Sequence, residues 1–151
     1  MHSLANRLFT LLISLVFLAL GICGSIPSLL HSPPPQYDTQ HMAVSLNYGY
    51  LFGIFAMNVV SDILFIAIGV VGILCMFNTV TSRYFERGLL TLSVIAVFLG
   101  FLPGGISGLW GLIPLWGWTD ALFLMTAMFS FYFAFVEGPL LPAINEPVSG
   151  H

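Results

Sequence analysis

Residues 59–77 read VVSDILFIAIGVVGILCMF, and this stretch decides the fold class. It contains one charged side chain, that of Asp62, and its length is close to the roughly 20 apolar residues that a helix needs to cross a bilayer. Apolar and polar residues do not alternate along it, as they do in the strands of a membrane barrel. The stretch therefore predicts a membrane-spanning helix.

Three further apolar runs of similar length occupy about residues 8–30, 89–109 and 119–137. Together the four runs predict an all-α membrane protein, a bundle of four transmembrane helices that forms a single integral membrane domain over residues 1–151. Residues 138–151 are then a short cytoplasmic tail. We expect the first run to be retained as a helix, because residues 21–24 (GICG) make a poor cleavage site for a signal peptide.

The composition agrees with this class. Hydrophobic residues make up 58% of the 151 residues and charged residues only 6%, whereas a soluble domain carries about 25% charged residues. Intrinsic disorder needs high charge, and nucleic-acid binding needs a basic surface. We therefore predict that the partners include membrane lipids and no nucleic acid. The expected location is multi-pass, in a cell inner membrane or a thylakoid-type membrane.

The few cations predict the orientation. Arg7 precedes the first run, Arg83 and Arg87 lie between the second and third, and the other two connections carry no Arg or Lys. Because cytoplasmic loops are enriched in Arg and Lys, we expect both termini and the segment with Arg83 and Arg87 to be cytoplasmic. Glu86 is expected in that same loop, which leaves no charge in mid-membrane and argues against a buried ion or proton relay.

The chain also contains an internal similarity. Residues 53–65 (GIFAMNVVSDILF) resemble residues 111–123 (GLIPLWGWTDALF), and residues 24–27 (GSIP) resemble residues 100–103 (GFLP). This order predicts two helical hairpins with the same orientation, which would be parallel repeats about an axis along the membrane normal.

The repeat places Asp62 and Asp120 at equivalent outer ends of the second and fourth helices. A carboxylate there favours the helix N-terminus, since it interacts with unpaired N–H groups and with the helix dipole, and this is the leading interpretation. The alternative is a symmetric cation or proton site. The residues of this candidate site are Asp62, Asp120, Asn58, Ser61 and Thr119.

Aromatic side chains gather at the second outer loop and on the fourth helix. Tryptophan favours the membrane–water interface, so an interfacial belt and lipid contact are the first interpretation. A groove for a bound lipid, carotenoid or chlorophyll is the alternative. The candidate contacts are Trp110, Trp116, Trp118, Phe129 and Phe133.

Residues typical of enzymes and metal centres are scarce in the predicted spans. All four histidines lie outside them, and the two cysteines, Cys23 and Cys75, form no C-x-x-C motif. Neither a G-x-S-x-G nor an H-E-x-x-H motif is present. We expect no catalytic residues, no metal site, no required cofactor and no enzymatic activity.

Three segments carry a family resemblance: residues 50–58 (YLFGIFAMN), residues 111–115 (GLIPL) with Gly117, and residues 132–136 (YFAFV). They resemble the domain of unknown function 4383 family of small bacterial, cyanobacterial-like, four-helix membrane proteins, from about Leu8 to Glu137. In that pattern an Asn precedes a His-Asn pair, and a second His follows one turn later. Asn58 matches the first Asn, whereas Ser61 and Asp62 stand at the His-Asn pair. Phe65, and Phe123 on the fourth helix, stand where the pattern has histidines.

Two functional hypotheses follow. The first is a non-enzymatic structural or accessory subunit that packs against other subunits of a larger membrane complex, respiratory or photosynthetic. The second is a small transporter or channel built around Asp62 and Asp120. The absence of a charge at the centre of any predicted span favours the first.

Overall fold

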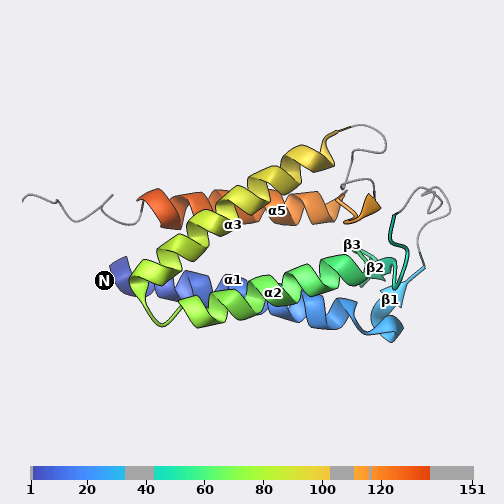
Figure 1. The fold of residues 1–151 in the computed structure, drawn as a ribbon, viewed down its shortest axis with the longest axis horizontal. Coiled ribbons are helices and arrows are strands. Elements are labelled where there is room, and N and C mark those ends of the chain that lie inside the picture. The colour runs from blue at the N-terminus through green and yellow to red at the C-terminus, as the bar shows by residue number, and fades with distance from the viewer. Residues whose placement is uncertain (1, 33–42, 103–110, 116, 137–151) are drawn as a thin grey trace, which may run out of the picture.

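In a computed structural model of the protein, residues 2–32, 43–102, 111–115 and 117–136 are described. These residues form four α-helices, as the hydropathy pattern predicts: α1 (His2–Gly24), α2 (Val59–Cys75), α3 (Thr79–Gly100) and α5 (Trp118–Phe131). A π-helix, η4 (Tyr132–Val136), continues α5. Helix α1 packs along α2 and α3 packs along α5, so the bundle consists of two hairpins (Figure 1).

The two ends of the bundle differ. One, which we call the N-terminal end, holds the start of α1, the connection between α2 and α3, and η4; the Arg7 side chain there donates to the Met76 carbonyl at 2.8 Å. The other, which we call the sheet end, holds a short 3-10 turn, η1 (Pro27–Leu29), and strands β1 (Leu30–His31), β2 (Gly49–Leu51) and β3 (Phe55–Met57). The strands pair antiparallel in the order β1-β2-β3. The sequence did not predict this sheet.

Helix α3 differs most from its predicted span. The third apolar run begins near residue 89, but the helix begins at Thr79, because the Asn78 side chain accepts a hydrogen bond from the Val80 N–H at 2.8 Å and so caps it. The expectation that Glu86 lies in a loop is therefore wrong. The polar residues that precede the apolar run are part of the helix, and the neighbouring helix α1 supplies hydrogen-bond donors for Glu86.

Small residues allow the close approach of α1 and α2. A Cβ atom at Gly69 would lie 2.6 Å from the Leu18 Cβ, so only glycine fits at this crossing. Such close contact is typical of helix pairs in membranes, where packing and interhelical hydrogen bonds drive association in place of the hydrophobic effect.

Aromatic rings join the two hairpins at the centre of the bundle. Phe17, Phe65 and Phe123 are buried, and their ring centroids lie 5.1 to 6.1 Å apart. Offset and edge-to-face contacts of this kind add to the stabilisation that burial alone provides.

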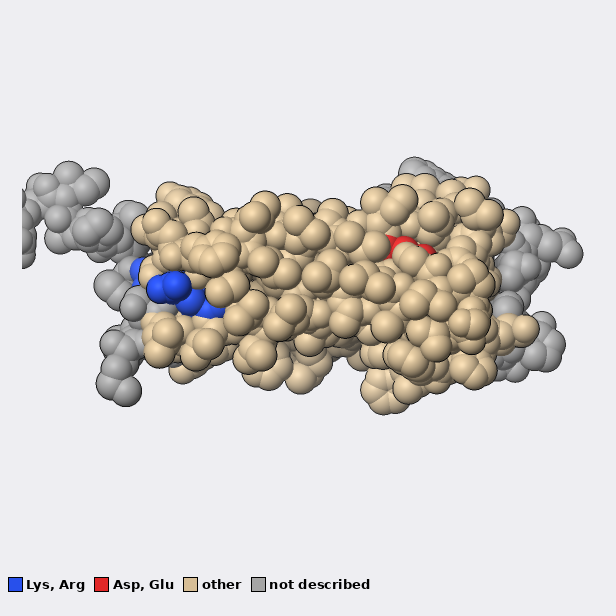
Figure 2. Space-filling view, turned by 90° about the horizontal axis from the view of Figure 1, so that it is seen from below, with Lys and Arg blue, Asp and Glu red and all other residues tan. Residues whose placement is uncertain are grey.

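Many large apolar side chains are exposed on the flanks, among them Leu74, Phe98 and Met128. Polar side chains share the interior with the apolar core. Among the described residues, twelve polar or charged side chains are buried: Asn6, Thr10, Ser14, Asn58, Ser61, Asp62, Ser82, Glu86, Ser93, Thr119, Thr126 and Ser130. On the face in Figure 2, the basic atoms lie toward the N-terminal end and the acidic atoms toward the sheet end, with an uncharged surface between them.

Two stretches of helix, Leu4–Gly24 and Trp118–Val136, are long and apolar enough to cross a membrane. Val59–Cys75 is a shorter apolar helix.

Candidate functional site

The carboxylates of Asp62 and Asp120 occupy equivalent surroundings. Each side chain lies in the first turn of the second helix of its hairpin and packs against a glycine near the end of the first helix. Asp62 faces Gly24, and Asp120 faces Gly100; a Cβ at Gly100 would lie 2.6 Å from the Asp120 Cγ. One oxygen of each carboxylate, Oδ1, is buried and has no hydrogen-bond partner.

The second oxygen of Asp62 has a side-chain partner outside α2. Asp62 is 2% exposed, and its Oδ2 accepts a hydrogen bond from the Asn47 Nδ2 at 3.2 Å. The same Asn47 amide donates to the Gly24 carbonyl at 2.8 Å, so it joins the end of α1 to the start of α2. Each aspartate therefore contacts the partner helix of its own hairpin.

The other three residues of the predicted cation or proton site form structural hydrogen bonds. Asn58 Oδ1 accepts from the Ser61 N–H and hydroxyl at 2.9 and 3.0 Å. Its Nδ2 donates to the carbonyls of Val44 and Leu112, at 3.1 and 2.9 Å. Thr119 Oγ1 donates to the Ala56 carbonyl at 3.4 Å. These hydrogen bonds stabilise the loops at the sheet end, and both the amide oxygen and the amide nitrogen of Asn58 have partners there.

A second buried carboxylate cluster lies near the N-terminal end, where the sequence did not suggest one. Glu86 on α3 is 0% exposed, and its two oxygens accept from Asn6 Nδ2 and Thr10 Oγ1 on α1, each at 3.0 Å. Asn6 Nδ2 also donates to the Phe133 carbonyl in η4 at 2.8 Å, so one amide connects three elements.

A signal for this cluster is present in the sequence. Asn6, Thr10 and Ser14 recur every four residues and so lie on one face of an otherwise apolar helix. A polar stripe on a membrane helix faces other helices, where it finds hydrogen-bond partners. The stripe thus indicates that α1 contacts a polar partner, although it does not identify Glu86.

The arginines flank this cluster. The Nε atoms of Arg83 and Arg87 are buried without a hydrogen-bond partner, and the Arg87 guanidinium lies 5.2 Å from the centroid of the Phe135 ring. The cation–π contact stabilises the charge where the helix flank is apolar. Glu137, which follows η4 in the sequence, lies outside the described residues.

An apolar groove runs along the flank between α2 and α3. One part has a volume of about 330 Å³, and the adjoining part, which shares Leu92, has about 210 Å³. A Cβ atom at Gly88 in the first part would meet nothing within 4 Å. The lining consists of apolar side chains and Gly88, so the groove suits a hydrocarbon-like occupant.

Three of the aromatic residues proposed as lipid or pigment contacts are described, Trp118 and Phe129 on α5 and Phe133 on η4. Phe129 and Phe133 help to line an apolar hollow of about 420 Å³ with Met125, Met128 and Tyr132. Phe133 also stacks on Phe9 of α1 at 4.3 Å. Trp118 is 65% exposed at the start of α5, whereas Trp110 and Trp116 lie outside the described residues.

Residues 7–136 match the family described as a domain of unknown function, DUF4383. The chain belongs to the DUF4383 family. Comparison with curated proteins and with solved structures found no match.

Phe65 and Phe123, which stand where the resemblance leads us to expect histidines, contact each other. The rings of Phe65 and Phe123 lie 5.8 Å apart at the centre of the bundle. Within the described ranges, no group of three or more His, Cys, Asp or Glu side chains is arranged to hold a metal ion. The two buried rings pack α2 of one hairpin against α5 of the other.

Proposed function

We propose that this DUF4383 protein is a non-enzymatic accessory subunit that packs in a larger membrane complex, respiratory or photosynthetic. The single observation that carries the proposal is the apolar groove between α2 and α3, which leaves the flank of the bundle incomplete. A hydrophobic helix of a partner subunit suits this groove, because close helix contact in membranes uses small residues such as Gly88.

The proposal includes four membrane spans in an inner or thylakoid-type membrane. Exposed apolar flanks, buried polar side chains and charges near the ends of the bundle support it. Helix α2 has 17 residues and so a length of about 26 Å, close to the thickness of a hydrocarbon core. The arginines predict that the N-terminal end is cytoplasmic.

The proposed architecture is two parallel-repeat hairpins. Its support is the pair of matching contacts, Gly24 with Asp62 and Gly100 with Asp120, at corresponding places in the two halves. The contact of Phe65 with Phe123, three residues after each aspartate, is what a local two-fold axis between the hairpins would produce.

The test is purification in a mild detergent, followed by native mass spectrometry of the wild type and two variants. Gly88→Leu places a side chain in the groove, and its Cβ meets nothing within 4 Å, whereas Ala19→Leu adds a similar bulk to the exposed flank of α1. We expect the wild type and Ala19→Leu to retain the same partner subunit and Gly88→Leu to lose it. A wild-type protein that runs as a clean monomer would contradict the proposal.

The second candidate is a small transporter or channel that uses Asp62 and Asp120. The observation in its favour is that each carboxylate leaves one buried oxygen without a partner. It ranks second because Asn58, Ser61 and Thr119 have structural partners, and because the groove and the hollow on α5 are not lined by either aspartate. If the double variant Asp62→Asn, Asp120→Asn folds and supports an unchanged ion or proton flux in vesicles, this candidate is excluded.

A further inference from the structure

The turn that joins β2 and β3 exposes apolar side chains at the sheet end. Phe52 and Ile54 are 55% and 44% exposed. Residues 43–61 contain no charged side chain, so nothing in this segment opposes contact with an apolar or interfacial phase. The turn is therefore an apolar tip on a segment that hydropathy did not assign to a span.

The backbone of the turn does not explain the choice of Phe52. Its φ angle is 53° and that of Gly53 is 73°, so two successive residues are left-handed. Glycine, asparagine and aspartate favour this conformation, whereas a bulky side chain does not. A phenylalanine held there with more than half of its surface exposed suggests that the ring contacts something outside the chain.

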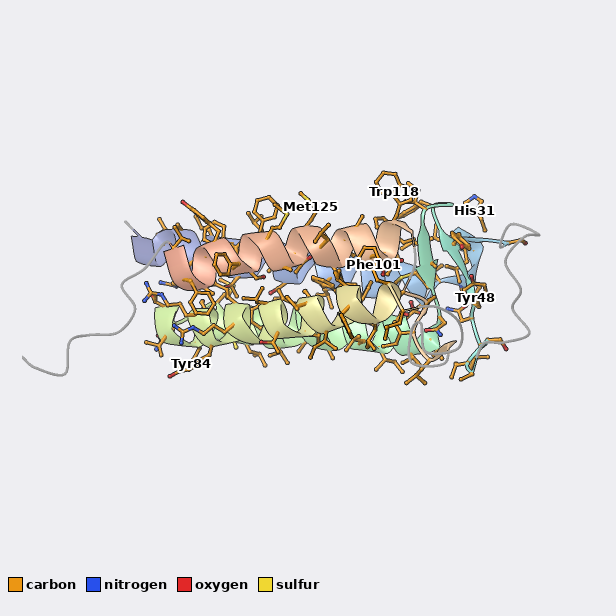
Figure 3. The ribbon with its side chains drawn as sticks, turned by 90° about the horizontal axis from the view of Figure 1, so that it is seen from above. His31, Tyr48, Tyr84, Phe101, Trp118 and Met125 are labelled. Atoms are coloured by element: carbon orange, nitrogen blue, oxygen red, sulfur yellow. The ribbon has the colours of Figure 1, made fainter. Side chains whose placement is uncertain are left out.

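The turn lies at the level where the helices end. Strand β3 docks on the first turn of α5 through the hydrogen bond from Thr119 to the Ala56 carbonyl. In Figure 3 strands β2 and β3 lie across the long axis of the bundle, with their turn on the side from which Trp118 and Met125 project. Trp118 there belongs to the residue type that favours the membrane–water interface.

Two backbone N–H groups of the turn are already paired. The N–H of Gly53 donates to the Tyr50 carbonyl, and the N–H of Ile54 donates to the Leu51 carbonyl, both at 3.0 Å. These bonds lower the cost of moving the turn out of water, because an unpaired backbone group in an apolar phase is unfavourable.

We propose that the β2–β3 turn is a membrane-interface arm, which inserts Phe52 and Ile54 among the lipid headgroups and upper acyl chains of the outer leaflet. The occupant of this surface is thus lipid. The apolar flank of α5 continues from Trp118 to Met125 on the same side, so lipid that covers this flank also reaches the turn. The inference rests on the proposed membrane embedding of the bundle.

The experiment measures collision of a nitroxide label with oxygen and with an aqueous nickel chelate, in nanodiscs of phosphatidylethanolamine and phosphatidylglycerol. Labels are attached to the full chain at Phe52→Cys, with Cys23 and Cys75 replaced by serine. Met125→Cys on the flank of α5 is the lipid control. His31→Cys is the aqueous control, because His31 is exposed and lies farther from the centre of the bundle than Trp118 (Figure 3).

We expect the oxygen-to-nickel collision ratio at position 52 to lie several-fold above that at position 31 and below that at position 125. Equal collision ratios at positions 52 and 31 would contradict the insertion of the β2–β3 turn, and would leave the proposed membrane embedding of the bundle unaffected. An aqueous ratio at position 125 would overturn the embedding and the arm together. If Phe52→Cys does not fold, Ile54→Cys on the same turn gives the same comparison.

Discussion

Glu86 is a buried carboxylate whose effect on stability depends on its hydrogen-bond partners. Its carboxylate is fully buried between α1 and α3, and each oxygen accepts one hydrogen bond from a side chain of α1. A buried carboxylate without such partners would be strongly destabilising. Asn6 and Thr10 therefore determine whether Glu86 can occupy the interior.

Loss of Asn6 should destabilise the fold. Asn6→Ala leaves one Glu86 oxygen and the Phe133 carbonyl without their donor, and we expect a decrease of about 1–3 kcal/mol in the free energy of unfolding. Thermal or denaturant unfolding in bicelles would measure it. In a Glu86→Met background the same substitution should cost less, since no carboxylate remains; equal costs in both backgrounds would contradict the role assigned to the pair.

The glycine–aspartate contacts predict a second effect at this scale. Gly24→Ala places a methyl group against the Asp62 carboxylate and 2.8 Å from the Met57 Cε, and we expect a loss of about 1–3 kcal/mol. Gly100→Ala should behave similarly, because its methyl group would meet Asp120. Gly88→Ala, which meets nothing within 4 Å, is the control, and should be neutral or stabilising by up to about 1 kcal/mol. A Gly24→Ala protein as stable as the wild type would rule out tight packing at this contact.

At the scale of elements, the start of α2 is hydrogen-bonded to several other segments at the sheet end. Asn58 caps α2 through the Ser61 N–H, and its amide reaches the segment before β2 and the segment before α5. One side chain thus connects the helix N-terminus to both loop regions, whereas an ordinary N-cap bonds only to its own helix.

This coupling can be compared with a simple cap in the same chain. Asn58→Ala removes bonds to Val44, Leu112 and Ser61, so we expect it to cost more than about 2 kcal/mol of unfolding free energy. Asn78→Ala removes one exposed bond to the Val80 N–H and should cost about 1 kcal/mol or less. Calorimetry of both variants would test the difference; equal losses would mean that Asn58 acts only as a cap.

At the scale of the whole molecule, both described chain ends and the connection between α2 and α3 lie at the N-terminal end (Figure 1). The basic atoms lie toward the same end (Figure 2). The buried polar side chains hold helices together, and the exposed flanks are apolar. This arrangement favours the orientation with the N-terminal end in the cytoplasm.

Reporter fusions test this orientation. A green fluorescent protein at either terminus should fluoresce, because it folds in the cytoplasm. Alkaline phosphatase, which is active only after export, should be active when fused after Ser32 and inactive when fused at the C-terminus. Phosphatase activity at the C-terminus would require an odd number of spans, or the reverse orientation, and would contradict the proposed topology.

The sequence by itself determined the helical class, the four helices and the family, because hydropathy over about 20 residues is a local property that needs no tertiary information. The duplicated motifs also predicted where Asp62 and Asp120 would lie relative to their helices, at the first turn of α2 and α5. Function and membrane topology stay predictions.

Only the tertiary structure determined which side chains surround the buried polar residues. Glu86 and Asn6 are 80 residues apart in sequence, and the helix that carries Glu86 extends through residues that a hydropathy window assigns to a loop. The β-sheet likewise joins segments that are distant in sequence, and its strand β3 contacts α5 through the hydrogen bond from Thr119 to the Ala56 carbonyl. The physical reason is that the free energy of burying a polar or strained residue depends on the partners that distant segments bring to it, and local composition does not contain them.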